Sequence, residues 1–150
     1  MAHTFSNLVV HVIFSTKDRR PLINPEIKKR LFEYMGGIIR EEGGNLLAIN
    51  GPEDHVHLLF KIPHAKSLAD LMRVLKTNSS RWVHQIWGKR GGFACQAGYG
   101  VFSVSESNVP SVSRYIADQE EHHKKVSFKE EFVAFLKNHG IEYNERYLWK

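Results

Sequence analysis

The segment from His55 to Ile62 constrains the fold most, because its side chains alternate as those of a buried β-strand do. Successive side chains of a strand point to opposite faces. Val56 and Leu58 therefore belong to an apolar face, while His55 and His57 share the other face. Two imidazoles on one strand face are aligned to bind one metal ion. They could equally occupy a half-exposed strand face without a ligand, and the rest of the chain has to decide.

The predicted elements follow the order β-α-β-β-α-β and then two further helices. Apolar runs and alternation predict strands at 8–14, 46–49, 55–62 and 101–104. Apolar residues at helical spacing predict helices at about 25–40, 68–86, 109–123 and 128–138. This order is typical of a ferredoxin-like or RRM-like split βαβ antiparallel sheet. We therefore predict an α+β protein with extra C-terminal helices, in which both long helices cover one face of the sheet and the histidine face stays open.

Polar residues mark three of the predicted helix starts. Asn24 precedes Pro25, and proline is favoured at the first helical position, so we expect Asn24 to cap the first helix. Ser67 is expected to cap the second helix and Ser127 the last one. These caps fix where the three helices begin.

The composition is that of an ordinary globular protein, with 42% hydrophobic and 25% charged residues among 150. This length fits a single domain spanning residues 1–150. Lysine and arginine number 21 against 16 acidic residues, which favours a polyanionic partner, although a basic surface also serves solubility. The single cysteine, Cys95, excludes an internal disulfide and fits a reducing cytoplasm. No leader-like segment and no apolar run of about 20 residues is present, so we expect a soluble, cytoplasmic protein without a membrane segment.

Two histidines form an incomplete site, since a catalytic metal ion generally takes three protein ligands and leaves positions open. Tyr115 and Gln119 are four residues apart in a predicted helix and therefore lie on one of its faces. The amide oxygen of Gln119 would complete a mixed nitrogen and oxygen site, one helical turn from the Tyr115 phenol. A metal ion that polarises a phosphate, beside a tyrosine that attacks it, suits phosphodiester chemistry. Tyr115 could instead be one of five tyrosines that pack helices against the sheet.

Two motifs together resemble a known family. Asp54-His55-Val56-His57 and Tyr115-Ile116-Ala117-Asp118-Gln119 are similar to the His-hydrophobic-His (HUH) signature and the single catalytic tyrosine of the small transposases that move bacterial insertion sequences as single-stranded DNA. The resemblance extends over about residues 5–149 and is supported by three further stretches, at 14–21, 96–105 and 142–149. Cys95 departs from the pattern, because many relatives would have an aromatic residue there.

The resemblance implies a mechanism and a partner. His55, His57 and Gln119 would bind a divalent ion, Mg²⁺ or Mn²⁺. Tyr115 would attack the DNA backbone to give a 5′-phosphotyrosine and a free 3′-hydroxyl. The substrate would be a hairpin in single-stranded DNA, and the protein would be a homodimer whose mobile tyrosine helix can complete the partner's histidine site. On ligand chemistry alone, Zn²⁺, Ni²⁺ or Co²⁺ would also bind two imidazoles and an amide.

Three further histidines and a set of basic residues belong to the hypothesis. His11 has the strand parity to share the histidine face, and His122 or His123 could approach the metal ion, contact phosphate or lie in solvent. Hairpin backbones need cations, and charge and placement identify six candidates for phosphate contacts. These are Lys17, Arg19, Arg20, Arg73, Lys76 and Arg81.

The leading hypothesis is therefore a metal-dependent transposase that cleaves and rejoins single-stranded DNA. On the same scaffold, a domesticated nuclease could process repeated palindromes without mobilising an element. A nucleic-acid-binding module, with a structural metal ion or none, is the alternative from a different class. A covalent DNA adduct that depends on Tyr115 would separate the two enzymes from the binding module.

Overall fold

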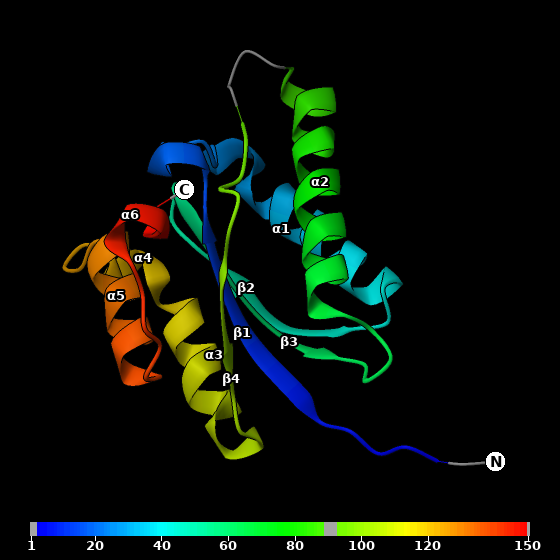
Figure 1. Ribbon diagram of the computed structural model, residues 1–150. Coiled ribbons are helices and arrows are strands. Elements are labelled where there is room, and N and C mark those ends of the chain that lie inside the picture. The colour runs from blue at the N-terminus through cyan, green and yellow to red at the C-terminus, as the bar shows by residue number, and fades with distance from the viewer. Residues whose placement is uncertain (1–2, 89–92, 150) are drawn as a thin grey trace.

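The computed structural model describes residues 3–88 and 93–149 (Figure 1). Within these ranges the strands are β1 (Leu8–Ser15), β2 (Asn45–Asn50), β3 (His55–Ile62) and β4 (Gly100–Ser103). The α-helices are α1 (Pro25–Glu41), α2 (Leu68–Trp87), α3 (Val109–Ala117), α4 (Gln119–His122), α5 (Phe128–Asn138) and α6 (Glu145–Leu148). Two short 3-10 turns, η1 (Lys17–Arg19) and η3 (Glu106–Asn108), follow β1 and β4. None of the helices in the described ranges is long and apolar enough to cross a membrane.

The strands form an antiparallel sheet in the order β2-β3-β1-β4. Helix α1 connects β1 to β2, and α2 connects β3 to β4, which is the connectivity of the split βαβ fold. The predicted α+β, ferredoxin-like architecture is therefore confirmed. The central strands are β1 and β3, and their register places Ser15 opposite His55 and Ile13 opposite His57.

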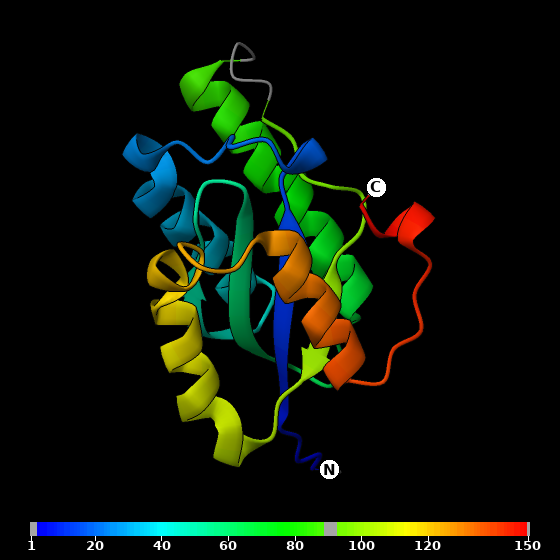
Figure 2. The same ribbon diagram turned by 90° about the vertical axis from the view of Figure 1, so that its left-hand side faces the viewer.

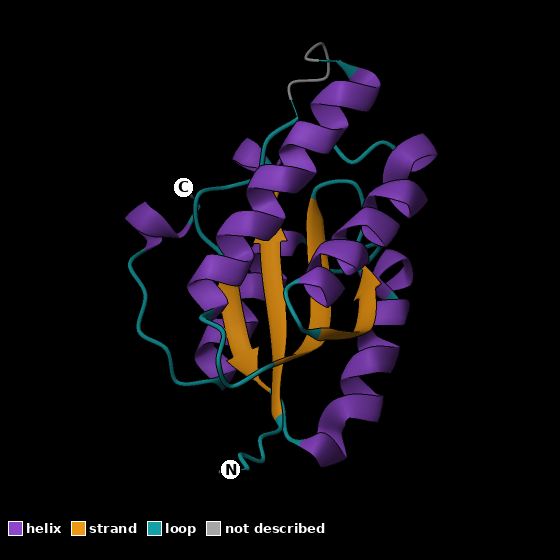
Figure 3. Ribbon diagram, turned by 90° about the vertical axis from the view of Figure 1, so that its right-hand side faces the viewer, coloured by secondary structure: helices purple, strands orange, loops and turns teal. Residues whose placement is uncertain are grey.

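Helices α1 and α2 cover one face of the sheet, as predicted (Figure 3). Phe14 and Leu58 point into this layer from the two central strands and belong to the same buried cluster as Met35 of α1 and Leu75 of α2. The side chains of the three predicted N-caps each accept a hydrogen bond from a backbone amide two or three residues ahead, at 2.8 to 3.3 Å. Local polar signals thus start the helices, and apolar packing holds them on the sheet.

The opposite face, which carries the histidines, is covered by α3 and α5, with α4 between them in the chain (Figure 2). The prediction that this face stays open is wrong. The face also carries apolar side chains, because Ile13 clusters with Phe132 of α5, and Leu59 clusters with Ile116 of α3. Leaving these side chains in water would cost free energy, so the apolar sides of the C-terminal helices close over them. The histidines between them are buried as a result.

The helix predicted at 109–123 is divided into two. Helix α3 ends at Ala117, and Asp118 has φ −94° and ψ 17°, outside the helical range, before α4 begins at Gln119. After this break Gln119 is fully buried, and the ring of His123 contacts that of His55 with centroids 4.3 Å apart. After the break, the chain thus brings His123 into contact with His55 of β3.

Candidate active site

The two histidines of β3 lie side by side on the covered face of the sheet. Both are fully buried, and their ring centroids are 5.1 Å apart. Their backbones are paired with Ser15 and Ile13 in β1, so the central strand pair fixes the position of each ring. The alignment of His55 and His57 on one face, which the alternation predicts, is confirmed.

One ring nitrogen of each histidine is held by a neighbouring side chain. Nδ1 of His55 lies 2.7 Å from Oδ1 of Asp54. Nδ1 of His57 lies 2.8 Å from Nε2 of His11. A partner that accepts a hydrogen bond from Nδ1 leaves the lone pair on Nε2 free, which is the form that binds a metal ion. His11 thus shares the histidine face, as its strand parity allows.

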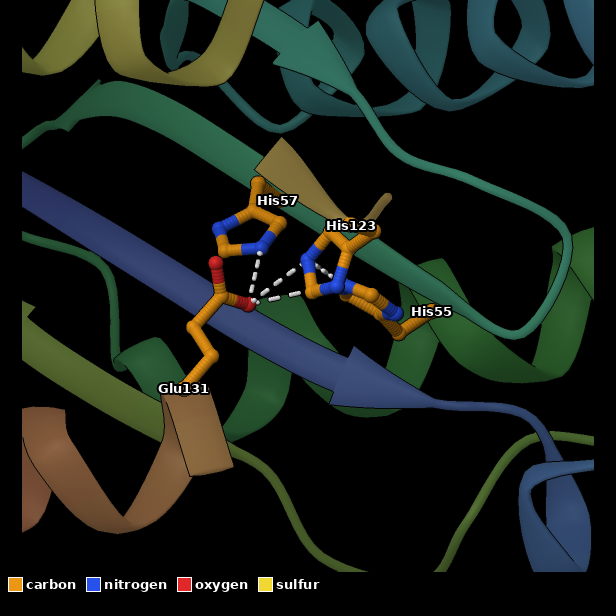
Figure 4. A group of neighbouring side chains, drawn as sticks. All are labelled: His55, His57, His123 and Glu131. Carbon is orange, nitrogen blue, oxygen red and sulfur yellow. Dashed lines mark hydrogen bonds and ion pairs between the residues drawn. The ribbon is translucent and has the colours of Figure 1, made fainter. Parts of the chain in front are cut away.

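Four side chains meet where the two Nε2 atoms point (Figure 4). Oε1 of Glu131, from α5, lies 3.4 Å from Nε2 of His55 and 2.9 Å from Nε2 of His57. Nε2 of His123 lies 3.2 Å from the same oxygen and 2.9 Å from Nε2 of His55. The four ligand atoms all lie within 4.8 Å of one another. We call His55, His57, His123 and Glu131 the His/Glu group.

The His/Glu group fits a divalent metal ion. Imidazole nitrogens and carboxylate oxygens are common ligands of such ions. Two atoms bound to one ion at about 2.1 Å, at a right or a tetrahedral angle, lie roughly 3.0 to 3.4 Å apart. The distances from Oε1 of Glu131 to the three Nε2 atoms, 2.9 to 3.4 Å, are close to this range. The donor types and their spacing both suit an ion at this place.

Tyr115 lies beside the same group. Its hydroxyl donates a hydrogen bond to Oε2 of Glu131 and lies 3.1 Å from Nε2 of His122. The centroid of its ring is 5.8 Å from that of His57. One chain therefore brings the tyrosine hydroxyl and the histidine pair together without a second subunit.

Gln119 is fully buried at the start of α4. Its Oε1 lies 2.9 Å from Nε2 of His123, and its side-chain amide donates to the backbone carbonyl of Tyr115 at 3.3 Å. The amide oxygen thus borders the His/Glu group through His123. Gln119 and His123 are both candidates for the third ligand, because they lie at the same corner of the site.

Glu131 is the residue of the site that the motifs do not reveal. The buried stripe of α5 includes Phe128, Phe132 and Leu136, and Glu131 occupies a position within that stripe. Its exposed fraction is 2%. Carboxylates are seldom buried without a partner, so an acidic residue within an apolar helical stripe is the signal that identifies it.

Burial and local contacts shift the pKa values of the histidines. Burial lowers the pKa of His11 to about 3 and the pKa of His57 to about 4. Burial also acts on His55, but hydrogen bonds to Asp54 and Glu131 outweigh it and raise the pKa. His11 and His57 are therefore neutral near pH 7, and a neutral imidazole is the form that a metal ion requires.

The acidic groups of the site are shifted by the same contacts. Burial acts to raise the pKa of Glu131, but its contacts with Nε2 of His123 and of the two β3 histidines hold that pKa well below its usual range. Burial and the neighbouring Glu131 carboxylate raise the pKa of Tyr115. The carboxylate is thus ionised and the phenol protonated in this arrangement.

A cleft of about 780 Å³ opens beside the His/Glu group. Asp54 and His123 line it, together with the basic side chains of Arg19 and Lys28. Glu120 also lines the cleft and pairs with Lys28 at 2.7 Å. The cleft connects the surface to two residues that contact His55.

The six basic residues predicted to contact phosphate lie in two places. One set lies in or next to η1 and consists of Lys17, Arg19 and Arg20. This segment is near the start of β3, because the backbone amide of Thr16 donates a hydrogen bond to the carbonyl of Asp54. The other set lies on α2, across the sheet from the histidines, and consists of Arg73, Lys76 and Arg81 (Figure 1). Within the second set, Lys76 donates to the backbone carbonyls of Ala97 and Gly98 at 3.0 and 3.2 Å.

A His-hydrophobic-His pair on the central strand of such a sheet, with a tyrosine-bearing helix beside it, defines an HUH protein. The family model described as "Transposase IS200 like" matches residues 4–119, and the chain belongs to this family of transposases. The resemblance inferred from the motifs is thereby confirmed.

Curated relatives agree with this assignment. The chain is 28% identical over 130 residues to the transposase for insertion sequence element IS200 of Salmonella typhimurium, covering 83% of this chain and 84% of that protein. It is 25% identical over 120 residues to the ISDra2 transposase TnpA of Deinococcus radiodurans, covering 75% of this chain and 84% of the relative.

Solved structures share the fold. A crystal structure of a protein described as a transposase from Deinococcus radiodurans R1 has a TM-score of 0.65 at 27% identity, covering 79% of this chain and 95% of that one. A REP-associated tyrosine transposase bound to a REP hairpin has a TM-score of 0.62 at 12% identity, covering 84% of this chain and 74% of that one. The second likeness shows the fold alone.

Proposed function

We propose that this transposase cleaves and rejoins single-stranded DNA at hairpin-marked element ends, through a 5′-phosphotyrosine intermediate on Tyr115. The observation that carries the proposal is the position of the Tyr115 hydroxyl, which shares the Glu131 carboxylate with His55 and His57. A nucleophile and a set of metal-ligating side chains can therefore act on one phosphodiester. Membership of the IS200-like family supports DNA as the substrate.

In the proposed reaction the Tyr115 oxygen attacks phosphorus while the bond from phosphorus to the 3′ oxygen breaks. The phenol loses its proton, and the departing 3′ oxygen gains one, so the products are a 5′-phosphotyrosine and a 3′-hydroxyl. The 3′-hydroxyl of another strand can reverse the step, which rejoins DNA without an external energy source. A divalent ion, Mg²⁺ or Mn²⁺, bound by His55, His57 and Gln119, would draw negative charge from the phosphate.

Two further residues act on the histidines in this proposal. Asp54 and His11 hold Nδ1 of His55 and of His57, so that each Nε2 stays directed at the site. They are positioning residues, because in this proposal they act on the reaction through the imidazoles.

We propose hairpins in single-stranded DNA as the binding partner. The likeness in fold to a transposase bound to a REP hairpin supports this substrate. The set of basic residues at η1 would contact phosphates next to the cleaved bond, because η1 lies near the start of β3. Arg73, Lys76 and Arg81 of α2 would contact a more distant part of the hairpin.

We also propose that the protein acts as a homodimer in the cytoplasm and that residues 1–150 form one HUH domain. The family resemblance supports the dimer, in which the tyrosine helix of one subunit can serve the other. The break between α3 and α4 at Asp118 gives such a movement a place to occur.

A covalent adduct tests the proposed function. The protein is incubated with an end-labelled single-stranded oligonucleotide that carries the hairpins flanking its own gene, with Mg²⁺ or Mn²⁺, and separated on a denaturing gel. We expect a DNA–protein adduct in the wild type and none in Tyr115→Phe. Tyr147→Phe, which removes a hydroxyl from a side chain that is 61% exposed, should form the adduct normally. Absence of the adduct with every such hairpin would refute the proposal.

A domesticated nuclease that processes repeated palindromes is the second candidate. It is suggested by the REP hairpin bound to the REP-associated tyrosine transposase, which has a similar fold. The two candidates share the phosphotyrosine chemistry but differ in genomic context, since only a mobile element should lie between the hairpins that its enzyme cuts. A binding module without catalysis would give no adduct at all.

A further inference from the structure

Helix α5 reaches the centre of the site, although it lies outside the residues that the family model matches. Ser127 caps the helix, and Phe128 and Phe132 pack it against the sheet. Glu131 precedes Phe132 and is therefore held over the histidine pair (Figure 4). The position of this carboxylate is set by the packing of the whole helix.

The two oxygens of the Glu131 carboxylate have different surroundings. Oε1 faces the three Nε2 atoms of the His/Glu group at 2.9 to 3.4 Å. Oε2 accepts the hydrogen bond of Tyr115 and lies 3.1 Å from Nε2 of His122. One oxygen is thus directed at the metal-ligating nitrogens and the other at the tyrosine hydroxyl.

A buried carboxylate needs positive charge nearby. Glu131 is 2% exposed, and all the ion pairs that it makes with the described residues are with histidines. A divalent cation among the nitrogens would balance the carboxylate more completely than imidazoles alone. The spacing of the donor atoms already suits such an ion.

We propose that Glu131 is a ligand of the metal ion that His55 and His57 bind, so that α5 is part of the active site. This inference rests on the metal dependence of the proposed function. Oε1 binds the ion, and Oε2 keeps its hydrogen bond to Tyr115, which fixes the hydroxyl beside the metal ion. A carboxylate adds an anionic oxygen to the two imidazole nitrogens, and Mg²⁺ and Mn²⁺ prefer such oxygen ligands.

Glu131→Gln tests the inference, because it keeps the size of the side chain and removes its charge. Glu130→Gln is the matched control, since Glu130 is exposed on the same helix and the substitution removes the same charge. Mn²⁺ binding is measured on the DNA-free protein by electron paramagnetic resonance of unbound Mn²⁺ and by calorimetry. We expect Glu131→Gln to weaken Mn²⁺ binding at least about tenfold and Glu130→Gln to leave it unchanged.

Thermal unfolding with and without Mn²⁺ makes the test independent of any change in stability. An ion that binds only the folded state raises the Tm. At one Mn²⁺ concentration that saturates the wild type, the Tm of the wild type and of Glu130→Gln should rise by the same amount, whereas the Tm of Glu131→Gln should rise clearly less above its own metal-free value.

Three results would overturn the inference. The first is a wild type that binds no Mn²⁺, and the second is an equal loss of Mn²⁺ affinity in both variants. The third is unchanged Mn²⁺ affinity in Glu131→Gln. If that variant also forms more DNA adduct than the wild type, the Glu131 carboxylate occupies the place of the scissile phosphate and does not bind the ion. The proposed function fails on a different result, the absence of a DNA adduct in the wild type.

Discussion

The two faces of the sheet are both buried, but only one of them carries the buried histidines among the described residues of its central strands. Toward α1 and α2, the central strands present apolar side chains such as Phe14 and Leu58. Toward α3 and α5, the same strands present His11, His55 and His57. Buried polar groups are costly unless they have partners, and each of these histidines has one. One face therefore contributes apolar packing, while the other combines apolar packing with polar groups held in a fixed arrangement.

Neighbouring residues of one strand can therefore have different roles, one in packing and the next in the metal site. Side chains at successive positions of β3 point to opposite faces, so a substitution at one position need not disturb the other face. The predictions below compare changes on the two faces or compare neighbouring side chains on the histidine face.

The largest contrast is expected between His57→Ala and Leu58→Ala. Leu58 is fully buried in the apolar layer, so its truncation should lower the free energy of unfolding by about 2–5 kcal/mol and leave the Mn²⁺ affinity of the folded protein unchanged. His57→Ala should weaken Mn²⁺ binding by more than about 100-fold, because it removes a proposed ligand. Urea unfolding and Mn²⁺ titration measure the two effects. Loss of Mn²⁺ binding in folded Leu58→Ala would show that the two faces are coupled.

The next effect concerns His11, whose Nε2 lies 2.8 Å from Nδ1 of His57. His11→Leu removes the group that holds Nδ1 of His57 and should weaken Mn²⁺ binding about 10–100-fold, as the loss of such partners does at other metal sites. His11→Asn keeps a hydrogen-bond acceptor and should recover part of the affinity. Equal affinities in the two variants, measured by the same titration, would mean that His11 only fills space.

A smaller effect should separate Gln119 from His123, which share one corner of the site. Mg²⁺ and Mn²⁺ prefer oxygen ligands, whereas Zn²⁺ binds imidazole well. We therefore expect Gln119→Ala to weaken Mn²⁺ binding about tenfold and His123→Ala to weaken Zn²⁺ binding more than Mn²⁺ binding. Competition titrations with both ions measure the difference. The opposite order would make His123 the third ligand for the ions that the family is expected to use.

Much of the fold could be predicted from the sequence, because its signals are local. Alternation in β1 and β3 and the caps at Asn24, Ser67 and Ser127 depend on residues a few positions apart. The cover over the histidine face could not be predicted in this way. It depends on apolar contacts between β1 and α5, which are more than 100 positions apart in the chain, and no local pattern specifies that pairing.

The residues of the candidate site also fall into two groups, those that local sequence patterns predict and those that depend on distant contacts. The pair His55 and His57 follows from the period of a strand. Helical spacing and the family resemblance single out Tyr115 and Gln119, although the helix expected to hold both is broken between them. The break at Asp118 was not predicted, and it changes which side chains after Gln119 can reach β3. Glu131 belongs to a helix whose packing on the sheet brings it to the site, so its role becomes visible only in three dimensions.

The smallest expected effect is a difference in the salt dependence of DNA binding between two pairs of basic residues. Lys17 and Arg20 are exposed next to η1, near the histidines, and Arg73 and Arg81 are exposed on α2, across the sheet. Replacing each pair by glutamine removes the same charge, and every lost contact with a single-stranded phosphate lowers the salt dependence of log K by about 0.7. We expect the double substitution at η1 to lower this slope by about 1.4 and the α2 pair to lower it less.

Fluorescence anisotropy of a labelled hairpin, titrated at several salt concentrations, measures both slopes. Tyr115→Phe serves as the background for both pairs, because it prevents covalent capture from contributing to the binding signal. If the α2 pair lowers the slope as much as the η1 pair or more, DNA crosses the side of the molecule formed by α1 and α2. The two faces would then differ in their metal ligands but not in their contribution to DNA binding.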